Sequence, residues 1–564
     1  MNMLDDAALE AFVKALAQAR DYSSVGERLR QTAPFKEGPF QAIIWAFDYR
    51  LVVISDKERR RRWGAYAPQL EWQGGATYPP TLDSVKDEDL ALWENVARDL
   101  NDPLGLSRLH DLLWERRHGS RPDLHARAAI EAYLELSFGR WGPLDKAHCL
   151  VRALELAQRI SDTGLRDKAL TRCIYLARAS LTSERPLPGV VVRLISAVQA
   201  LSPQSTELDS LSQDAEAAFS GNPWVLESLF DLKASRTTDP KQRRVVGEDL
   251  VRLWRDVAER NVGVARFAYL QHALELAHKY GLSDHAHDIK RSIQGLTNED
   301  LQLSCTSATA LVPTDEAERF IAWFIEPSQW ENSLLRFGYY GPPGGGHQNR
   351  LARVTQLMAD HPLQFLFPKA IIGAENALIR LASSPEEHKD VALIEDQALG
   401  IRIWGVFAAD VLDRIRAKYG EPTVGELTGF FKTEIISEDI AERVARALLL
   451  FWNGETDESA HILVPRLEAI IRTLAREIGL PVIREPRGDC PGGVKQLGDL
   501  LHSLSGYLDD DWRRYLDNLL VEPVGVNLRN RVAHGLISSV NKQEAALLIH
   551  CVCFLRRLEL RHSG

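Results

Sequence analysis

A nine-residue segment near the C-terminal end of the chain holds the side chains with the clearest chemical potential. It runs Asn527-Leu528-Arg529-Asn530-Arg531-Val532-Ala533-His534-Gly535 and places an arginine, an amide and a histidine within six positions. Arginine holds a phosphate through a rigid fork of donors. Histidine takes up a proton near neutral pH without unusual tuning. These groups suit cleavage of RNA without a metal ion.

The local pattern predicts that this segment opens a helix. Asn527 is a good N-cap residue. Arg529 and Asn530 then fall in the first turn, where free backbone N–H groups and the helix dipole favour an anion. Asn530 and His534 are four positions apart and share a face. Arg529 and His534 lie about 140° apart around an ideal helix, so they converge only if the turn is irregular or a second copy completes the site.

Spacing alone does not separate this segment from chance matches. Similar spacings recur at Arg557 with His562 and, one residue longer, at Arg266 with His272. The segment differs in having the adjacent Asn530, the following Gly535 and a position before a capped apolar helix. The structural alternative is that Arg529 and His534 only tie a helical bundle together.

The balance of charge restricts where nucleic acid can bind. The formal net charge is −10, so binding needs a local basic patch. From Gly525 to Gly564 there are six basic residues and two acidic ones, a difference of +4: Arg529, Arg531, Lys542, Arg556, Arg557 and Arg561 against Glu544 and Glu559. Four consecutive arginines, residues 59–62, form a second basic run. Such a run is more often a solvated helix end than a phosphate contact.

Composition indicates a large globular protein with several cores. The chain has 564 residues, of which 45% are hydrophobic and 26% charged. No apolar run approaches the ~18 residues that span a bilayer. The acidic N-terminus lacks the features of a signal peptide. The expectation is a cytoplasmic protein that does not enter a membrane.

The sequence contains no convincing site for a metal or a cofactor. Its six cysteines are scattered and are expected to be reduced. The two histidines of His285-Ala286-His287-Asp288 would not converge on a helix. The Gly/Pro-rich segment 338–346 lacks the lysine and hydroxyl residue of a phosphate-binding loop, so it is expected to be a linker or lid. Neither a metal nor a cofactor is predicted.

Apolar periodicity predicts an all-α, multi-domain protein. Residues 1–140 form an N-terminal, mostly helical domain, and residues 141–310 form an α-solenoid-like domain of irregular helical repeats. Residues 311–437 are a helical connector that carries the loop 338–346. Residues 438–564 form a helical bundle, whose last helix begins at a capping box, Asn541 to Glu544, and runs to Arg561.

The C-terminal bundle resembles the HEPN superfamily of α-helical ribonucleases and nucleotide-binding domains. The resemblance rests on the R-N-x3-H-G pattern of Arg529, Asn530, His534 and Gly535. More closely, the stretch 461–474 together with the motif is similar to a bacterial domain-of-unknown-function family catalogued as 4209. The resemblance covers roughly residues 438–560 and is specific at the motif.

The resemblance implies a role for each motif residue. His534 would act as general base or position the RNA 2′-hydroxyl, and Arg529 would bind the scissile phosphate. Asn530 would orient the histidine or the hydroxyl, and Arg531 and Lys542 would add contacts to RNA. Attack by the 2′-oxygen would leave a 2′,3′-cyclic phosphate without a metal. HEPN ribonucleases generally pair two motif copies across a homodimer, and many relatives are toxins or anti-phage effectors.

Two functions therefore follow from the sequence. The first is a dimeric, metal-independent endoribonuclease whose N-terminal helical domains respond to a protein or phage trigger. The second is a non-catalytic helical scaffold or nucleotide-binding protein that uses the HEPN-like bundle for dimerisation. Retention of Arg529, Asn530 and His534 together favours the first. The acidic net charge favours the second.

Overall fold

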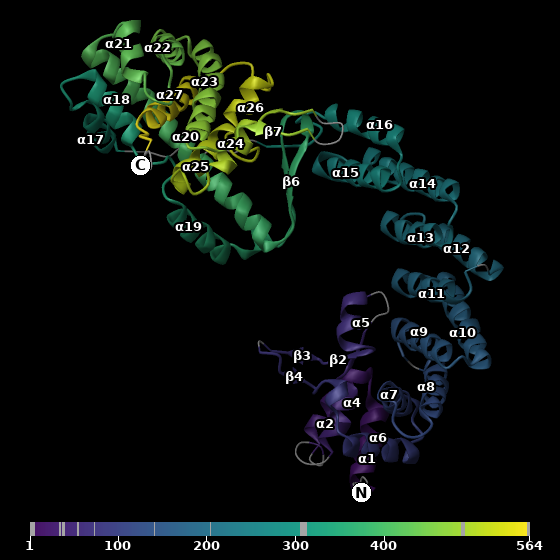
Figure 1. Cartoon of the computed structure of the whole chain (residues 1–564). Coiled ribbons are helices and arrows are strands. Elements are labelled where there is room, and N and C mark those ends of the chain that lie inside the picture. The colour runs from purple at the N-terminus through teal and green to yellow at the C-terminus, as the bar shows by residue number, and fades with distance from the viewer. Residues whose placement is uncertain are drawn as a thin grey trace. The chain divides into compact units, whose positions relative to one another are not determined.

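The structure is a computed structural model of the chain. It describes residues 6–32, 35, 40–52, 56–72, 74–139, 141–203, 205–304, 313–486 and 491–560. Most of these residues are helical, and the strands form only short antiparallel pairs (Figure 1). The prediction of an all-α protein is confirmed. No helix in the described ranges is long and apolar enough to cross a membrane.

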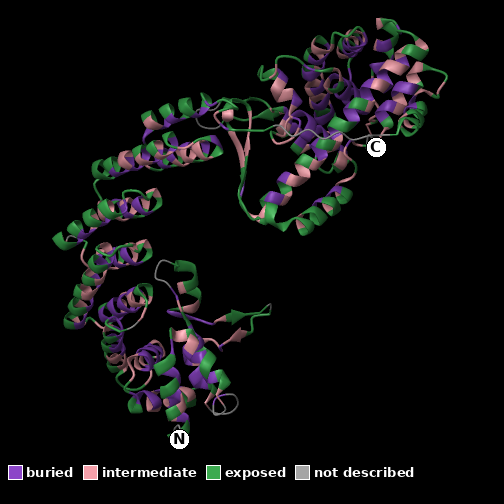
Figure 2. Cartoon of the chain, turned by 180° about the vertical axis from the view of Figure 1, so that it is seen from behind, coloured by how far each residue is buried: buried purple, intermediate pink, exposed green. Residues whose placement is uncertain are grey.

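The chain divides into two compact units, residues 1–290 and 291–564. Each unit has a hydrophobic core of its own. In the view coloured by burial, the buried residues of each unit face the neighbouring helices within that unit (Figure 2). The finer division into four domains stays a prediction.

The first unit consists of successive helices with two short strand pairs near its start. Its helices are α1 (Asp6–Gln18), α2 (Tyr22–Gln31), α4 (Gln41–Asp48), α5 (Lys57–Trp63), α6 (Asp87–Asp99), α7 (Pro103–Glu115), α8 (Pro122–Leu136), α9 (Pro143–Arg159), α10 (Thr163–Leu181), α11 (Pro188–Leu201), α12 (Thr206–Ala218), α13 (Pro223–Arg236), α14 (Pro240–Glu259), α15 (Gly263–Lys279) and the first part of α16 (Ser283–Gln294). Its strands are β1 (Arg50–Leu51), β2 (Tyr66–Ala67), β3 (Leu70–Glu71) and β4 (Thr77–Tyr78).

Local sequence explains where many of these helices begin. Proline occupies the first position of α7, α13 and α14, where its missing N–H costs no hydrogen bond. The residue before each proline, Asp102, Asn222 or Asp239, accepts hydrogen bonds from the free N–H groups of the first turn. From α8 to α11, each helix packs on the next.

The second unit is a bundle built around one long helix. Its other elements are α17 (Thr314–Ile325), α18 (Trp330–Tyr339), α19 (His347–Asp360), β5 (Lys369–Ile372), β6 (Leu378–Ala382), α21 (Val424–Phe431), α22 (Glu438–Trp452), α23 (Thr456–Glu477), β7 (Ile483–Arg484), β8 (Gly493–Val494), α24 (Leu497–Ser503), α25 (Asp510–Leu520), α26 (Leu528–Ala533) and α27 (Lys542–Arg556). The long helix, α20 (Pro385–Tyr419), packs against α17, α18, α19, α25 and α27. The core extends from Ile321 to Leu555, across residue 438 where the sequence suggests a boundary.

The glycine-rich loop before α19 packs closely on α20. A Cβ atom added at Gly400 of α20 would lie 2.5 Å from the Cα of Gly344, so both glycines are needed for this approach. The Asp511 carboxylate accepts a hydrogen bond of 2.7 Å from the His347 N–H at the start of α19. The loop is thus part of the packed unit.

Two predictions about local structure are wrong. The last helix keeps the predicted capping box of Asn541 and Glu544 but ends at Arg556. The N–H groups of Arg557 and Leu558 bond to the carbonyls three residues back, so the last turn tightens and the α-helix stops. The region after residue 350, predicted to be helical, contains the hairpin of β5 and β6. Its turn includes Asn376 with φ 57°, a conformation that asparagine tolerates better than most residues.

A buried histidine in this core is expected to make the second unit sensitive to acid. His550 of α27 is 0% exposed, and burial lowers its pKa from 6.5 to about 3. In the unfolded chain this histidine is protonated below about pH 6.5, whereas in the folded chain it stays neutral down to about pH 3. The free energy of unfolding therefore falls as the pH drops from 6.5 to 3. Between pH 6.5 and 5 we expect the unit to lose about 2 kcal/mol of unfolding free energy. Denaturant titrations at both pH values should show a smaller loss in His550→Gln, and equal losses would contradict this prediction.

Candidate functional site

The motif segment lies on α26, a helix of six residues between α25 and α27. Leu528 and Val532 are buried and attach the helix to the core. Asn527 is the N-cap residue, as predicted, but it adopts the left-handed conformation with φ 54° and its side chain caps no backbone N–H. Its carboxamide oxygen instead accepts a 2.8 Å hydrogen bond from the Asn530 side chain. The predicted cap interaction is therefore replaced by a contact between the two asparagines.

Arg529 is held by a carboxylate on the neighbouring helix α23. Its Nε and Nη2 donate to Glu468 Oε2 at 3.2 and 2.8 Å, and its Nη1 donates to Asn530 Oδ1 at 2.9 Å. Glu468 Oε1 accepts a further hydrogen bond of 2.6 Å from Arg472. The Arg529 and Glu468 side chains are 20% and 18% exposed. A guanidinium has five donors, so these three contacts leave two for another acceptor.

Asn530 has its hydrogen-bonding groups engaged within α26 and its surroundings. Besides accepting from Arg529, it donates to Asn527 Oδ1 at 2.8 Å and to the Val521 carbonyl at 3.2 Å. An amide held by three partners has a fixed orientation. The side chains of Arg529 and Asn530, which are adjacent in the sequence, are therefore in direct contact.

His534 follows α26 and is exposed to solvent. Its backbone N–H donates to the Asn530 carbonyl at 3.0 Å. Within the described parts of the chain, its imidazole forms no hydrogen bond or ion pair, and the partners of the Arg529 guanidinium are Glu468 and Asn530. The expectation that a second copy completes the site stays a prediction. The histidine is therefore available for a ligand or a second copy.

The other predicted RNA-binding cations are already paired. Arg531 donates to Glu544 Oε1 at 2.9 Å, and Lys542 donates to Asp413 Oδ2 at 2.6 Å. Arg556 donates to the Phe430 carbonyl at 2.6 Å. The positive charge counted along the sequence is thus partly neutralised by carboxylates from other helices. Arg561 lies outside the described residues.

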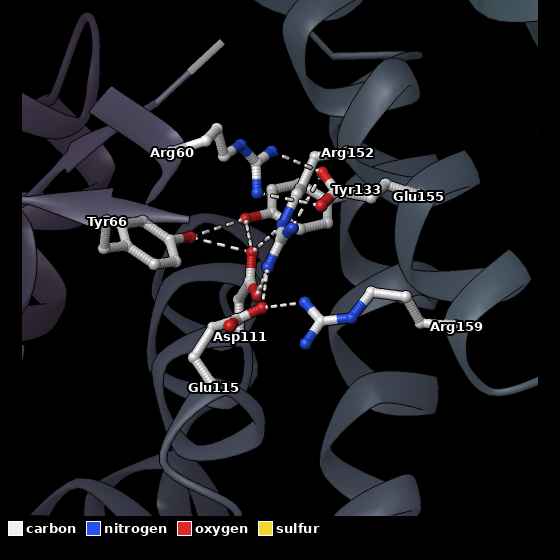
Figure 3. A network of polar contacts seen from close by, with 8 residues as sticks. All are labelled: Arg60, Tyr66, Asp111, Glu115, Tyr133, Arg152, Glu155 and Arg159. Carbon is white, nitrogen blue, oxygen red and sulfur yellow. Dashed lines mark hydrogen bonds and ion pairs between the residues drawn. The ribbon is translucent and has the colours of Figure 1, made fainter. Parts of the chain in front are cut away.

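A second polar cluster lies in the first unit and was not found from the sequence (Figure 3). Arg152 of α9 is 1% exposed and donates to Asp111 of α7 at 2.8 and 2.6 Å. The Tyr66 and Tyr133 hydroxyls each donate to the same carboxylate at 2.7 Å. Burial alone would raise the pKa of Asp111, but Arg152 and these hydroxyls hold it below its usual value.

The cluster continues on both sides of Arg152. Arg152 also contacts Glu115 at 2.6 Å and Glu155 at 2.8 Å. Glu155 accepts two hydrogen bonds from Arg60 of α5, at 2.9 and 2.8 Å, and Arg159 pairs with Glu115. Three arginines therefore balance three carboxylates. The sequence did hold a signal for this cluster. The two acids on α7 are spaced by about one helical turn, and so are the charged residues on α9.

No group of three potential metal ligands occurs in the part of the chain that the structure describes. Cys149, Cys173, Cys551 and Cys553 are buried, free thiols, while Cys305 and Cys490 lie outside the described residues. His285 and His287 lie within α16.

Comparison with known proteins gives one match, in the first unit. Residues 58–169 match the model of a family described as Domain of unknown function (DUF7380). All eight residues drawn in Figure 3 fall inside this match. No curated protein and no solved structure matches the chain.

Proposed function

We propose that the chain is a metal-independent endoribonuclease of the HEPN type with Arg529, Asn530 and His534 in its active site. The observation that carries the proposal is that two of the three motif side chains are held in place by neighbouring residues, while the third is exposed. Arg529 and Asn530 are fixed by neighbours, whereas the His534 imidazole is exposed. An imidazole without a partner in the bundle is free to exchange a proton with a ligand.

The reaction follows from these positions. The two remaining donors of Arg529 bind a phosphate oxygen and stabilise the charge that develops on it. His534 accepts the proton of the RNA 2′-hydroxyl while the 2′-oxygen forms a bond to phosphorus. The bond from phosphorus to the 5′-oxygen breaks, and that oxygen takes a proton from a second acid. The products are a 2′,3′-cyclic phosphate and a 5′-hydroxyl.

A homodimer supplies the second acid. One motif supplies a single histidine, so a second motif copy is needed to place a histidine on each side of the phosphate. An excess of His534→Ala chains mixed with the wild type should therefore lower its activity, because each mixed dimer keeps only one of the two histidines. In this proposal the first unit receives a protein or phage trigger, and the role is that of a toxin or anti-phage effector.

The second candidate is a scaffold or nucleotide-binding protein whose bundle dimerises without catalysis. It is favoured by the contact between Arg529 and Glu468, which neutralises the arginine inside the fold. In that case the motif residues serve to attach α26 to α23.

Incubation of the full chain with total RNA and a chelator distinguishes the two candidates. The ribonuclease proposal predicts chelator-resistant cleavage that is lost in Arg529→Ala. Cleavage that persists in Arg529→Ala would place the activity elsewhere, and no cleavage by the wild type would favour the scaffold.

Glu468 is expected to be a positioning residue for Arg529. In Glu468→Gln, the adjacent Arg472 and Arg529 lose the carboxylate that they share. We expect a loss of about 1–2 kcal/mol of unfolding free energy, because two nearby cations are left uncompensated. The rate of RNA cleavage should fall about tenfold through a lower kcat, because the guanidinium no longer has a fixed orientation.

The matched control for this substitution is Glu442→Gln. Glu442 forms an exposed pair with Arg446 on α22 of the same unit. This variant should keep wild-type stability and rate. An unchanged cleavage rate in Glu468→Gln would show that Glu468 does not position Arg529.

A further inference from the structure

A small cavity in the first unit has three arginine side chains in its wall, beside three aliphatic side chains. Its volume is about 70 Å³, several times the space that one water needs. Arg60 of α5, His148 and Arg152 of α9, and Arg193 of α11 line it, together with Glu155. The cavity thus collects three arginines and one histidine against a single carboxylate.

That carboxylate does not neutralise the whole lining. Glu155 is shared between Arg60 and Arg152, and the cluster of Figure 3 already balances three arginines with three carboxylates. Arg193 is not one of these three arginines. Within the described residues it forms no hydrogen bond and no ion pair. It is therefore a surplus positive charge at the cavity wall.

Donor groups at the cavity lack partners within the protein. Among the buried nitrogen atoms of the lining residues, Nε2 of His148 and Nε of Arg60 have no hydrogen-bond partner, while Nη1 of Arg152 faces Glu155 at 2.8 Å. Burial and the charge of Arg193 together lower the pKa of His148, and burial lowers that of Arg193. Native proteins rarely leave buried polar groups unsatisfied, and an anion in this cavity would provide the acceptors.

A larger cavity of about 430 Å³ adjoins the small one, because Leu51 and His148 line both. Its walls include the aromatic side chains of Tyr22, Tyr66, Tyr133 and Trp141. These rings offer apolar faces of the kind on which a planar ligand group stacks.

Arg108 gives the larger cavity a buried cation as well. It is 4% exposed, lies 4.1 Å from the centre of the Tyr22 ring, and donates to the Tyr49 carbonyl at 3.2 Å. Its Nε has no partner. No carboxylate forms an ion pair with this guanidinium in the part of the chain described here.

We propose that these adjoining cavities bind a small phosphorylated molecule, with its phosphate beside Arg60, His148 and Arg193 and a planar ring among the tyrosines of the larger cavity. The site is distinct from the motif of the second unit, and it does not depend on the ribonuclease proposal. The surplus charge of Arg193 and the unpartnered nitrogen of Arg60 suit a phosphate oxygen. The adjacent aromatic cavity accounts for a ring.

Isothermal titration of the full chain with adenosine monophosphate, adenosine and inorganic phosphate tests this site. We expect the nucleotide to bind at least tenfold more tightly than either fragment, since each fragment fills only one cavity. Arg193→Gln should weaken nucleotide binding at least tenfold, and His148→Gln should also weaken it. The control Arg178→Gln removes the same charge from an exposed position on α10 and should leave binding unchanged.

Three outcomes would overturn the proposal. Absence of binding by all three probes at millimolar concentration would exclude a phosphorylated ligand of this kind. Equal affinity for phosphate and nucleotide would exclude a ring in the larger cavity. Equal affinity of Arg193→Gln and the wild type would place the phosphate elsewhere.

Discussion

His534→Ala is expected to reduce the rate of RNA cleavage at least 100-fold while leaving the protein as stable as the wild type. A general acid–base residue contributes about 10²–10⁴ to a rate. The side chain is exposed, so its removal creates no cavity and leaves no buried group without a partner. Cleavage rates with a chelator present, together with thermal unfolding of both proteins, provide the measurement.

His361→Ala is the matched control for this substitution. His361 is also an exposed histidine directly after a helix of the second unit, and its backbone N–H closes the last turn of α19. Its replacement should alter neither rate nor stability. If both variants cleave RNA as the wild type does, His534 is not the general base.

Arg152→Met is expected to destabilise the first unit by about 3–5 kcal/mol, the usual cost of removing one partner from a buried ion pair. Arg152 is 1% exposed and contacts the carboxylates of Asp111, Glu115 and Glu155. Without it, Asp111 stays buried with only two tyrosine hydroxyls as donors. Thermal unfolding of the full chain should show an earlier transition for the first unit and little change in the second.

The exposed pair of Arg121 and Asp123 provides the comparison. These side chains are 66% and 35% exposed, and exposed pairs contribute little to stability. Arg121→Met should leave the unfolding transition of the first unit unchanged. Equal behaviour of Arg152→Met and Arg121→Met would contradict a structural role for the buried cluster.

The helical architecture could be predicted because it depends on local patterns. Apolar periodicity and caps such as Asn541 with Glu544 act over a few residues, and the structure confirms the all-α class and that capping box. The hairpin of β5 and β6 was missed because its strands are short and pair mainly with each other. The end of α27 was missed because no glycine or proline between Asn541 and Arg561 marks where the helix stops.

The motif could be found from the sequence, but its partners could not. The contact of Arg529 with Glu468 joins residues 61 positions apart, and no local pattern predicts it. No local pattern predicts the pairing of Arg60 with Glu155 either. The surplus charge of Arg193 is evident only when α5, α9 and α11 are packed together around the cavity. Charge counted along the chain overstated the basic character of the last forty residues, because Arg531 and Lys542 pair with carboxylates.

The most direct test of the ribonuclease proposal uses a short RNA that the full chain cleaves at one position, with a chelator present. A single 2′-O-methyl group at the nucleotide 5′ to the cleaved bond removes the nucleophile and leaves the phosphate unchanged. The proposal predicts that the unmodified RNA yields a 2′,3′-cyclic phosphate and that the methylated RNA is not cut at that bond. Continued cleavage of the methylated RNA would contradict attack by the 2′-hydroxyl and, with it, the roles assigned to Arg529 and His534.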